Sequence, residues 1–216
     1  PRIHSNDEHF EVRRFVEPHA LPDGTAPPDV KLIETCIVLP FDTQAEIKAF
    51  RAYVSPQQAV LEIGQALKRL GLRTLLFLRC IDEIRWSLPD GARGAFLRET
   101  RRVKDKPAAR YVDVTDGHNT ETWLLFRRDT AVTDEGKSHP VAVEVGFLLQ
   151  EGNVVHAKNT ELVVSFPTAK KTELGFLIQG PFKTTKARDN IAPDSEANQR
   201  LIETAAELAA GSLEDL

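Results

Sequence analysis

A short segment near the carboxyl-terminal end concentrates the residue types that bind anions. After the apolar run 174–178 comes Gly180, then four polar or cationic side chains at 183–186, and then Arg188. Cationic groups, hydroxyls and free backbone N–H groups near a helix start together suit a phosphate. An arginine there can also stabilise the charge on a transferring phosphoryl group. The alternative is a polar loop in which Arg188 and Asp189 pair locally and cap the following helix.

The signatures of self-contained enzymes are absent from the sequence. There is no Gly-x-x-x-x-Gly-Lys-Ser/Thr, no Gly-x-Gly-x-x-Gly, no Gly-x-Ser-x-Gly and no His-Glu-x-x-His. A stand-alone kinase or hydrolase is therefore not expected. Cys36 and Cys80 match no metal-binding spacing, and we expect two buried free thiols.

Histidines and carboxylates give weaker signals. His4 and His9 can ligate a metal on a loop, but on one strand their odd spacing points them to opposite faces, so we expect a solvated surface. Alternation along strand-like runs predicts solvent-facing positions for five carboxylates: Glu34, Asp82, Glu83, Asp113 and Glu144. The charged run 98–106 and the pair Lys170-Lys171 are expected in solvated loops or at sheet edges.

Two helices are predicted from capping residues and hydrophobic periodicity. The first spans 55–71, with Ser55 as N-cap, Pro56 at its first position, Gln58 at the capping-box position and Gly71 closing it in a left-handed turn. The second spans about 195–210, begins at an Asp194-Ser195 cap and stops at Gly211. Its apolar face carries Ala197, Leu201, Ile202, Ala205 and Leu208.

The region from Thr74 to Gln179 reads as a series of strands. Turn signals separate several of them as hairpins, at 89–91, 116–117, 134–136 and 151–153. The first strand of this series is expected to start at Leu75 and continue through Ile81 to Trp86. Strands, a helix, a long antiparallel series and a final helix predict an α+β fold with mostly antiparallel strands.

Composition limits the classes of function. The chain has 216 residues, 41% hydrophobic and 28% charged, with a formal net charge of −4. An acidic balance argues against nucleic acid as the main partner, and no apolar run is long enough to span a membrane, so a cytoplasmic location is expected. The chain starts with Pro1 and contains no methionine, which indicates a segment of a longer polypeptide.

The block 176–201 resembles the middle region of sacsin-like proteins, which are heat-shock-chaperone-type ATPases of the GHKL superfamily. In that pattern a strand ends at a glycine near an aromatic residue, and a Ser/Thr-rich loop leads to an arginine, with an asparagine near the start of the next helix. The matching residues are Gly180, Phe182, Thr184, Thr185, Arg188 and Asn198. In the same order, 1–10 resembles the strand after the ATP lid, 35–40 the last strand of the nucleotide domain, and 75–79 the first strand of the middle domain.

The resemblance implies three parts and a role. Residues 1–50 would be the C-terminal strands of a nucleotide-binding domain, 51–72 a connecting helix, and 73–216 the middle (transducer) domain. Arg188 would reach the γ-phosphate of ATP when the nucleotide domain closes, and Lys186 would act with it. Further contacts to the nucleotide would come from Lys183, Thr185 and Gln179, with no metal ligand in this chain.

The ATP-binding motifs of the family are absent: there is no Glu-x-x-x-Asn helix, no Asp-x-Gly-x-Gly turn and no glycine-rich lid. ATP and Mg²⁺ would thus be bound mainly by an N-terminal nucleotide-binding portion outside this chain, and the chain alone is not expected to be an active ATPase. A homodimer and an unidentified client are further partners compatible with the resemblance. The alternatives are a stand-alone α+β binding or scaffold module and, third, a nucleic-acid binder using the cations of 98–110 and 170–188.

Overall fold

The chain forms two compact units, residues 1–64 and 65–216. A computed structural model describes seven stretches of it, apart from the side chains of Lys68 and Asp134: 2–5, 8–13, 17–22, 35–38, 55–134, 136–192 and 194–216. Glu34, one of the five carboxylates, lies outside the described residues, as do residues 39 and 40 of the strand expected over 35–40.

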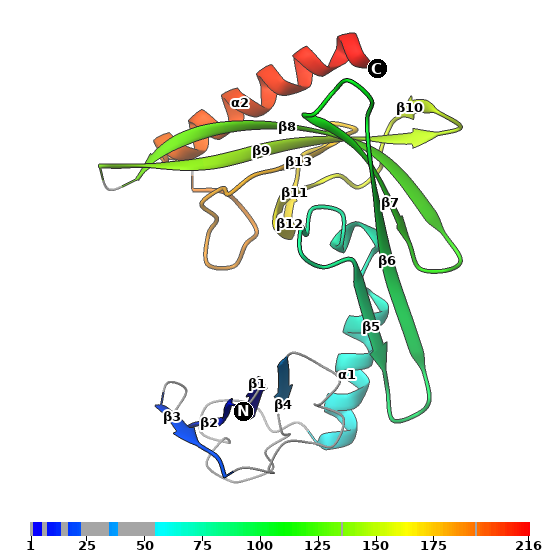
Figure 1. The fold of residues 1–216 in the computed structure, drawn as a ribbon, viewed down its shortest axis with the longest axis vertical. Coiled ribbons are helices and arrows are strands. Elements are labelled where there is room, and N and C mark those ends of the chain that lie inside the picture. Colours follow the sequence, from blue (N-terminus) through cyan, green and yellow to red (C-terminus); the bar gives the residue numbers. More distant parts are fainter. Residues whose placement is uncertain are drawn as a thin grey trace. The chain divides into compact units, whose positions relative to one another are not determined.

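The described part of the first unit contains an antiparallel sheet of four strands in the order β3-β2-β1-β4 (Figure 1). Its strands are β1 (Arg2–Ser5), β2 (Glu8–Arg13), β3 (Glu17–Ala20) and β4 (Thr35–Val38). The chain reverses between β1 and β2, so that residues 2–5 pair with residues 8–11. The described residues 2–5 and 8–13 therefore form two paired strands and not one continuous strand.

Helix α1 (Pro56–Lys68) begins as the sequence predicts. The Ser55 Oγ accepts a hydrogen bond from the Gln58 N–H at 3.1 Å, which confirms the N-cap. Its end differs from the prediction, because Gly71 has an extended φ of −88° and not a left-handed one. The chain continues from Gly71 into the 3₁₀ turn η3 (Leu72–Thr74), so no reversal is needed there.

The second unit is built on a nine-stranded sheet with the order β12-β11-β13-β9-β8-β7-β6-β5, with β10 paired to β9 (Figure 1). Every pairing is antiparallel except that of β11 with β13. The strands are β5 (Glu83–Ser87), β6 (Arg93–Arg102), β7 (Ala109–Thr115), β8 (Thr120–Asp134), β9 (Lys137–Gln150), β10 (Asn153–Val155), β11 (Glu161–Val164), β12 (Phe166–Lys171) and β13 (Leu177–Gln179).

All four predicted hairpin turns are confirmed. They join β5 to β6, β7 to β8, β8 to β9 and β9 to β10. Gly91 and Gly117 have φ of 85° and 87° in two of these turns, a conformation that glycine adopts without steric cost. Lys170 and Lys171 lie on β12 at the edge of the sheet, as expected.

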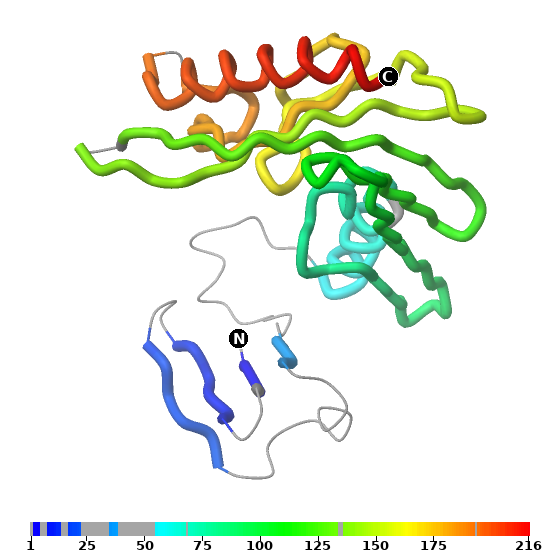
Figure 2. The backbone as a smooth tube through the Cα atoms, turned by 45° about the horizontal axis from the view of Figure 1, so that its top comes forward, coloured from blue at the N-terminus to red at the C-terminus, as the bar shows by residue number. Residues whose placement is uncertain are grey.

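Helix α2 (Glu196–Ser212) covers one face of the sheet along β8 and β9 (Figure 2). The Ser195 Oγ accepts from the Asn198 N–H at 3.3 Å, which confirms the predicted cap. The buried contacts of the helix with the sheet include Leu201, Ala205 and Leu208. Ile202, predicted on this face, is 48% exposed, and Gly211 lies inside the helix and does not end it. The turn η4 (Leu213–Asp215) follows directly.

The opposite face of the sheet is covered in part by the segment that follows η3. Leu75, Leu76 and Phe77 are buried there against strand residues that include Val112 and Trp123. The predicted strand from Leu75 is wrong in this part, because 75–77 form turns and the strand β5 begins only at Glu83. A short apolar run buried on all sides has no alternation that separates a strand from a turn.

These elements confirm the α+β class with mostly antiparallel strands and a C-terminal helix. None of the helices in the described stretches is long and apolar enough to cross a membrane.

Candidate anion-binding site

A row of polar residues crosses the central strands on the face opposite α2. Arg127 on β8 lies directly opposite Glu144 on β9, and Glu144 lies directly opposite Gln179 on β13. Directly paired residues point to the same face of a sheet. Glu144 is only 1% exposed, so the expectation that it faces solvent is wrong. The side chains of Arg79, Arg110 and Arg127 contact Glu144 at the position that alternation alone places at a surface.

Three guanidinium groups converge on one oxygen of Glu144. Its Oε1 lies 3.0 Å from Arg110 Nη1, 3.4 Å from Arg79 Nη2 and 3.8 Å from Arg127 Nη1. The other oxygen, Oε2, is buried and has no hydrogen-bond partner. A buried carboxylate is tolerated only where opposite charge compensates its lost hydration. The arginines supply that compensation, and three guanidinium charges face the one carboxylate charge of Glu144.

Arg79 reaches the row from the loop between η3 and β5. Arg98, whose side chain is only 9% exposed, holds this loop from β6. Its Nη2 donates to Asp82 Oδ1 at 2.6 Å and to the Arg79 carbonyl at 3.1 Å, and its Nη1 to the Leu75 carbonyl at 3.5 Å. Arg98 was expected in a solvated loop or at an edge, but it lies on an inner strand and organises the segment that carries Arg79.

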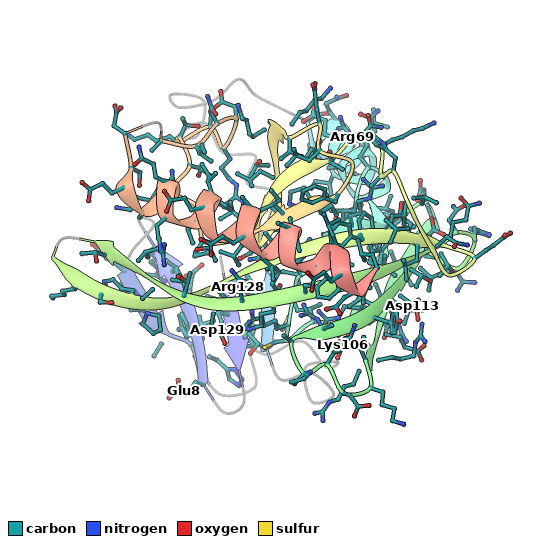
Figure 3. All side chains as sticks on the ribbon, turned by 90° about the horizontal axis from the view of Figure 1, so that it is seen from above. Glu8, Arg69, Lys106, Asp113, Arg128 and Asp129 are labelled. Carbon is teal, nitrogen blue, oxygen red and sulfur yellow. The ribbon has the colours of Figure 1, made fainter. Side chains whose placement is uncertain are left out.

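A pocket of about 510 Å³ opens beside the arginines. Its polar lining comes from Arg79, Arg127, Asp129, Ser165 and Gln179. The Gln179 Oε1 is buried and lacks a hydrogen-bond partner. Arg127 Nη2 bonds Asp129 Oδ1 at 2.5 Å. The next residue on β8, Arg128, pairs with Glu207 of α2 on the other face. Arg128 and Asp129 are labelled in Figure 3.

The charges around this pocket sum to a positive value. Three arginines face two carboxylates, Glu144 and Asp129, which leaves one net positive charge with many N–H donors. A partly shielded positive pocket of this kind favours an anion with several acceptor oxygens.

A larger cavity of about 730 Å³ lies next to η3 and β11, and two of its charged lining residues, Arg73 and Glu121, pair with each other. The Arg73 guanidinium bonds both oxygens of Glu121 at 3.1 and 3.2 Å and lies 5.1 Å from the centre of the Trp123 ring. Trp123 Nε1 donates to the same carboxylate at 2.9 Å. This closed network is best explained as packing of the segment onto the sheet.

The predicted phosphate loop follows β13 and is closed at its base. An isolated bridge joins Thr184 to Ile191, and the Ala192 N–H donates to the Lys183 carbonyl at 2.9 Å. Asn198, buried in α2, accepts from the Lys183 N–H at 2.8 Å. Its Nδ2 donates to the carbonyls of Lys183 and Ala192 at 2.9 and 3.0 Å. The loop therefore has a fixed base and an exposed tip.

The side chains predicted to bind nucleotide occupy different parts of this loop. Arg188, at a φ of 56°, donates from Nη2 to the carbonyls of Val164 at 3.0 Å and Phe166 at 3.4 Å. Thr185 Oγ1 donates to Asp189 Oδ1 at 2.5 Å. The alternative in which Arg188 and Asp189 pair and cap the helix is therefore wrong, because Arg188 bonds backbone carbonyls and Ser195 caps α2. Lys183 and Lys186 are exposed at the surface.

The structure places one of the five predicted residues in the lining of the arginine pocket, and a second, Arg188, bonds the backbone next to it. Gln179 lines it directly. The Arg188 guanidinium binds the carbonyls on either side of Ser165, which is another lining residue. The side chains that line the pocket do not include Lys183, Thr185 or Lys186. Sequence reasoning missed Arg79 and Arg127 and included Arg110 only in the cationic run 98–110, because single arginines carry no spacing signal.

Two expectations about the other candidate residues are wrong. His4 is 1% exposed and not at a solvated surface; it pairs in register with His9 and with Cys36, and the two imidazole centroids are 5.0 Å apart. Cys80 is exposed, and Cys36 is half-buried. Within the described stretches, no group of three or more His, Cys, Asp and Glu side chains is arranged to hold a metal ion.

Comparisons with known proteins give one informative similarity. No family model matches the chain, and no solved structure matches it. The chain is similar to Protein NO VEIN of Arabidopsis thaliana, with 27% identity over an alignment 226 positions long that covers 94% of this chain. The aligned region is 8% of that protein, so the chain spans less than a tenth of the length of this relative.

Proposed function

We propose that this chain is part of a sacsin-like, heat-shock-chaperone-type ATPase and that it senses the γ-phosphate of ATP. In this proposal Arg188, assisted by Lys186, contacts the γ-phosphate when a nucleotide-binding portion outside the chain closes over it. ATP and Mg²⁺ are bound mainly by that portion. Closure is then transmitted through the second unit to other parts of a longer, cytoplasmic protein.

The observation that carries the proposal is the loop 183–192, whose base is fixed and whose tip is exposed. A contact that must form only on closure needs a cation that is held in place without being buried. Asn198 and the bridge from Thr184 to Ile191 supply the fixed base. The exposed tip carries Lys186 and Arg188.

The present bonding of Arg188 is compatible with this role. Its guanidinium donates to two neutral backbone carbonyls. Hydrogen bonds from arginine to phosphate oxygens are charge-assisted and roughly twice as strong as bonds between neutral groups. A phosphate that approaches the loop can therefore compete for the guanidinium, which already lies at the surface.

The similarity to Protein NO VEIN also supports a role within a longer chain. The similar segment there is 8% of the polypeptide, so segments of this kind do occur inside much longer proteins. Under the proposal, the reading frame upstream of the Pro1 codon encodes the Glu-x-x-x-Asn helix, the Asp-x-Gly-x-Gly turn and the lid. A frame without them would contradict it and would favour a binding or scaffold module.

The decisive experiment uses the full-length parent protein. We expect Arg188→Ala to lower ATP turnover about a hundredfold or more while nucleotide affinity changes by less than about threefold. Arg102→Ala, at an exposed arginine of β6, is the matched control and should leave both unchanged. Equal loss of turnover and affinity in Arg188→Ala, or no loss, would contradict the proposed role.

A further inference from the structure

We propose that the pocket lined by Arg79, Arg127 and Gln179 is a binding site for hydrogen phosphate, an oxyanion that keeps one proton near neutral pH. The proposal rests on the contacts of the pocket alone. It does not depend on the role assigned to Arg188, and it is tested without ATP.

The arginines supply the anion-binding half of the site. Arg79 and Arg127 both line the pocket, and both also contact the Oε1 of Glu144, which they share with Arg110. One carboxylate oxygen cannot satisfy the N–H donors of three guanidinium groups, each of which has five. The carboxylate fixes the guanidinium groups in place. Arg127 Nη2 also bonds Asp129, and the donors beyond these bonds are available to a ligand.

Two acceptor oxygens supply the other half, one from Gln179 in the pocket lining and one from Glu144, its direct sheet partner, which does not itself line the pocket. The Glu144 Oε2 and the Gln179 Oε1 are both shielded from solvent, and neither has a hydrogen-bond donor. Their residues are directly opposite each other on β9 and β13 and share a face of the sheet. Unpartnered buried acceptors favour a ligand that brings a donor of its own.

Hydrogen phosphate meets both requirements, since its P–O⁻ oxygens accept from the arginines and its P–O–H group donates to the acceptors. Sulfate has no proton at neutral pH and would place only acceptor oxygens against Glu144. A phosphate monoester, whose second pKa is about 6, is also largely without a proton at about pH 7.5. The pocket should therefore select hydrogen phosphate over both.

Movement of the Arg79 side chain can give a ligand access to the two buried acceptors, Glu144 Oε2 and Gln179 Oε1. Arg79 is 54% exposed, against 31% for Arg127 and 23% for Arg110, and it is 3.4 Å from Glu144. When its guanidinium turns from the carboxylate to a bound anion, Arg110 stays on Glu144 at 3.0 Å. The buried charge thus keeps a partner while the ligand enters.

The test is isothermal titration calorimetry of the 216-residue chain at about pH 7.5, with inorganic phosphate, sulfate and methyl phosphate, a monoester without other hydroxyl groups, at equal ionic strength. We expect inorganic phosphate to bind at least about tenfold more tightly than either other anion. Sulfate or the monoester binding as tightly as inorganic phosphate would overturn the proposal, and so would folded protein that binds no phosphate.

Three variants locate the site. Arg79→Gln, at an exposed side chain, should weaken phosphate binding about tenfold, whereas Arg102→Gln on β6 should not. Gln179→Met keeps the volume but removes an acceptor, so it should reduce the preference for phosphate over sulfate at least about threefold. An equal effect of Arg102→Gln and Arg79→Gln, or an unchanged preference in folded Gln179→Met, would overturn the assignment.

Discussion

Asn198 of α2 holds both backbone groups of Lys183, at the start of the loop that follows β13. Its Oδ1 accepts from the Lys183 N–H at 2.8 Å, and its Nδ2 donates to the Lys183 carbonyl at 2.9 Å. The same Nδ2 donates to Ala192, at the other end of the loop. A single buried amide therefore fixes where this loop begins and where it ends.

Asn198→Ala should lower the free energy of unfolding by about 2–3 kcal/mol, because the Lys183 N–H and the Ala192 carbonyl each lose a buried partner. Urea unfolding measures the change. Gln199→Ala, at the exposed neighbour on the same helix, is the control and should change stability by no more than about 0.5 kcal/mol. If the two variants are equally stable, the amide does not hold the loop.

Glu144→Gln should destabilise the second unit by about 2–4 kcal/mol. The substitution leaves three guanidinium groups without their shared carboxylate, and the cost stays below that of a fully buried pair because each arginine keeps some exposure. Glu99→Gln, at an exposed carboxylate of β6, is the control for urea unfolding.

A double variant separates charge from shape at this position. Glu144→Gln combined with Arg110→Gln should cost less than the sum of the single variants, since the second change removes one of the uncompensated charges. Strict additivity would mean that the carboxylate is not the counter-ion of Arg110.

Local features of the fold, which depend on residues adjacent in the sequence, could be predicted from the sequence. The caps at Ser55 and Ser195 and the four hairpin turns each depend on a few adjacent side chains, and the structure confirms them. The continuous strand expected through His4 and His9 is wrong because the chain reverses between them. Residues five apart on a single strand point to opposite faces, whereas His4 and His9 lie on paired strands, directly opposite each other.

The candidate site depends on strand register, which the sequence does not display. Arg127, Glu144 and Gln179 meet only because β8, β9 and β13 pair at one particular alignment. Arg79 joins them through a turn where a strand was expected. Gln179 was identified through its place in the 176–201 block, whereas nothing local marks the three arginines.

Asp116, in the turn between β7 and β8, should make stability depend on acid pH. Backbone hydrogen bonds from Asn119 and His118 hold the pKa of its carboxyl below the ordinary value. Because the pKa of Asp116 is depressed in the folded state, its carboxylate contributes to the free energy of unfolding at pH values above the unfolded-state pKa of about 3.9. This contribution is lost as the pH falls through the folded-state pKa. The midpoint temperature of thermal unfolding of the wild-type chain should therefore decrease as the pH is lowered through this range.

The matched variant is Asp116→Ala, which should be less stable than the wild type near neutral pH and should approach it in acid. Asp116→Asn keeps an oxygen that can accept from the His118 and Asn119 N–H groups but cannot ionise. Its stability should change less with pH in this range than that of the wild type. An unchanged pH dependence in both variants would contradict the assignment to Asp116.

Arg98→Ala should disturb both the fold and the phosphate pocket, because this side chain bonds the carbonyls of the loop that carries Arg79. We expect a loss of about 2–3 kcal/mol in urea unfolding and, in the protein that remains folded, phosphate binding weakened about as much as by Arg79→Gln. Arg93→Ala, on the same strand and exposed, is the control.

Asp82 is 75% exposed, so Asp82→Ala should lower the free energy of unfolding by less than Arg98→Ala does. If Asp82→Ala costs as much, the ion pair and not the carbonyl bonds sets the position of Arg79.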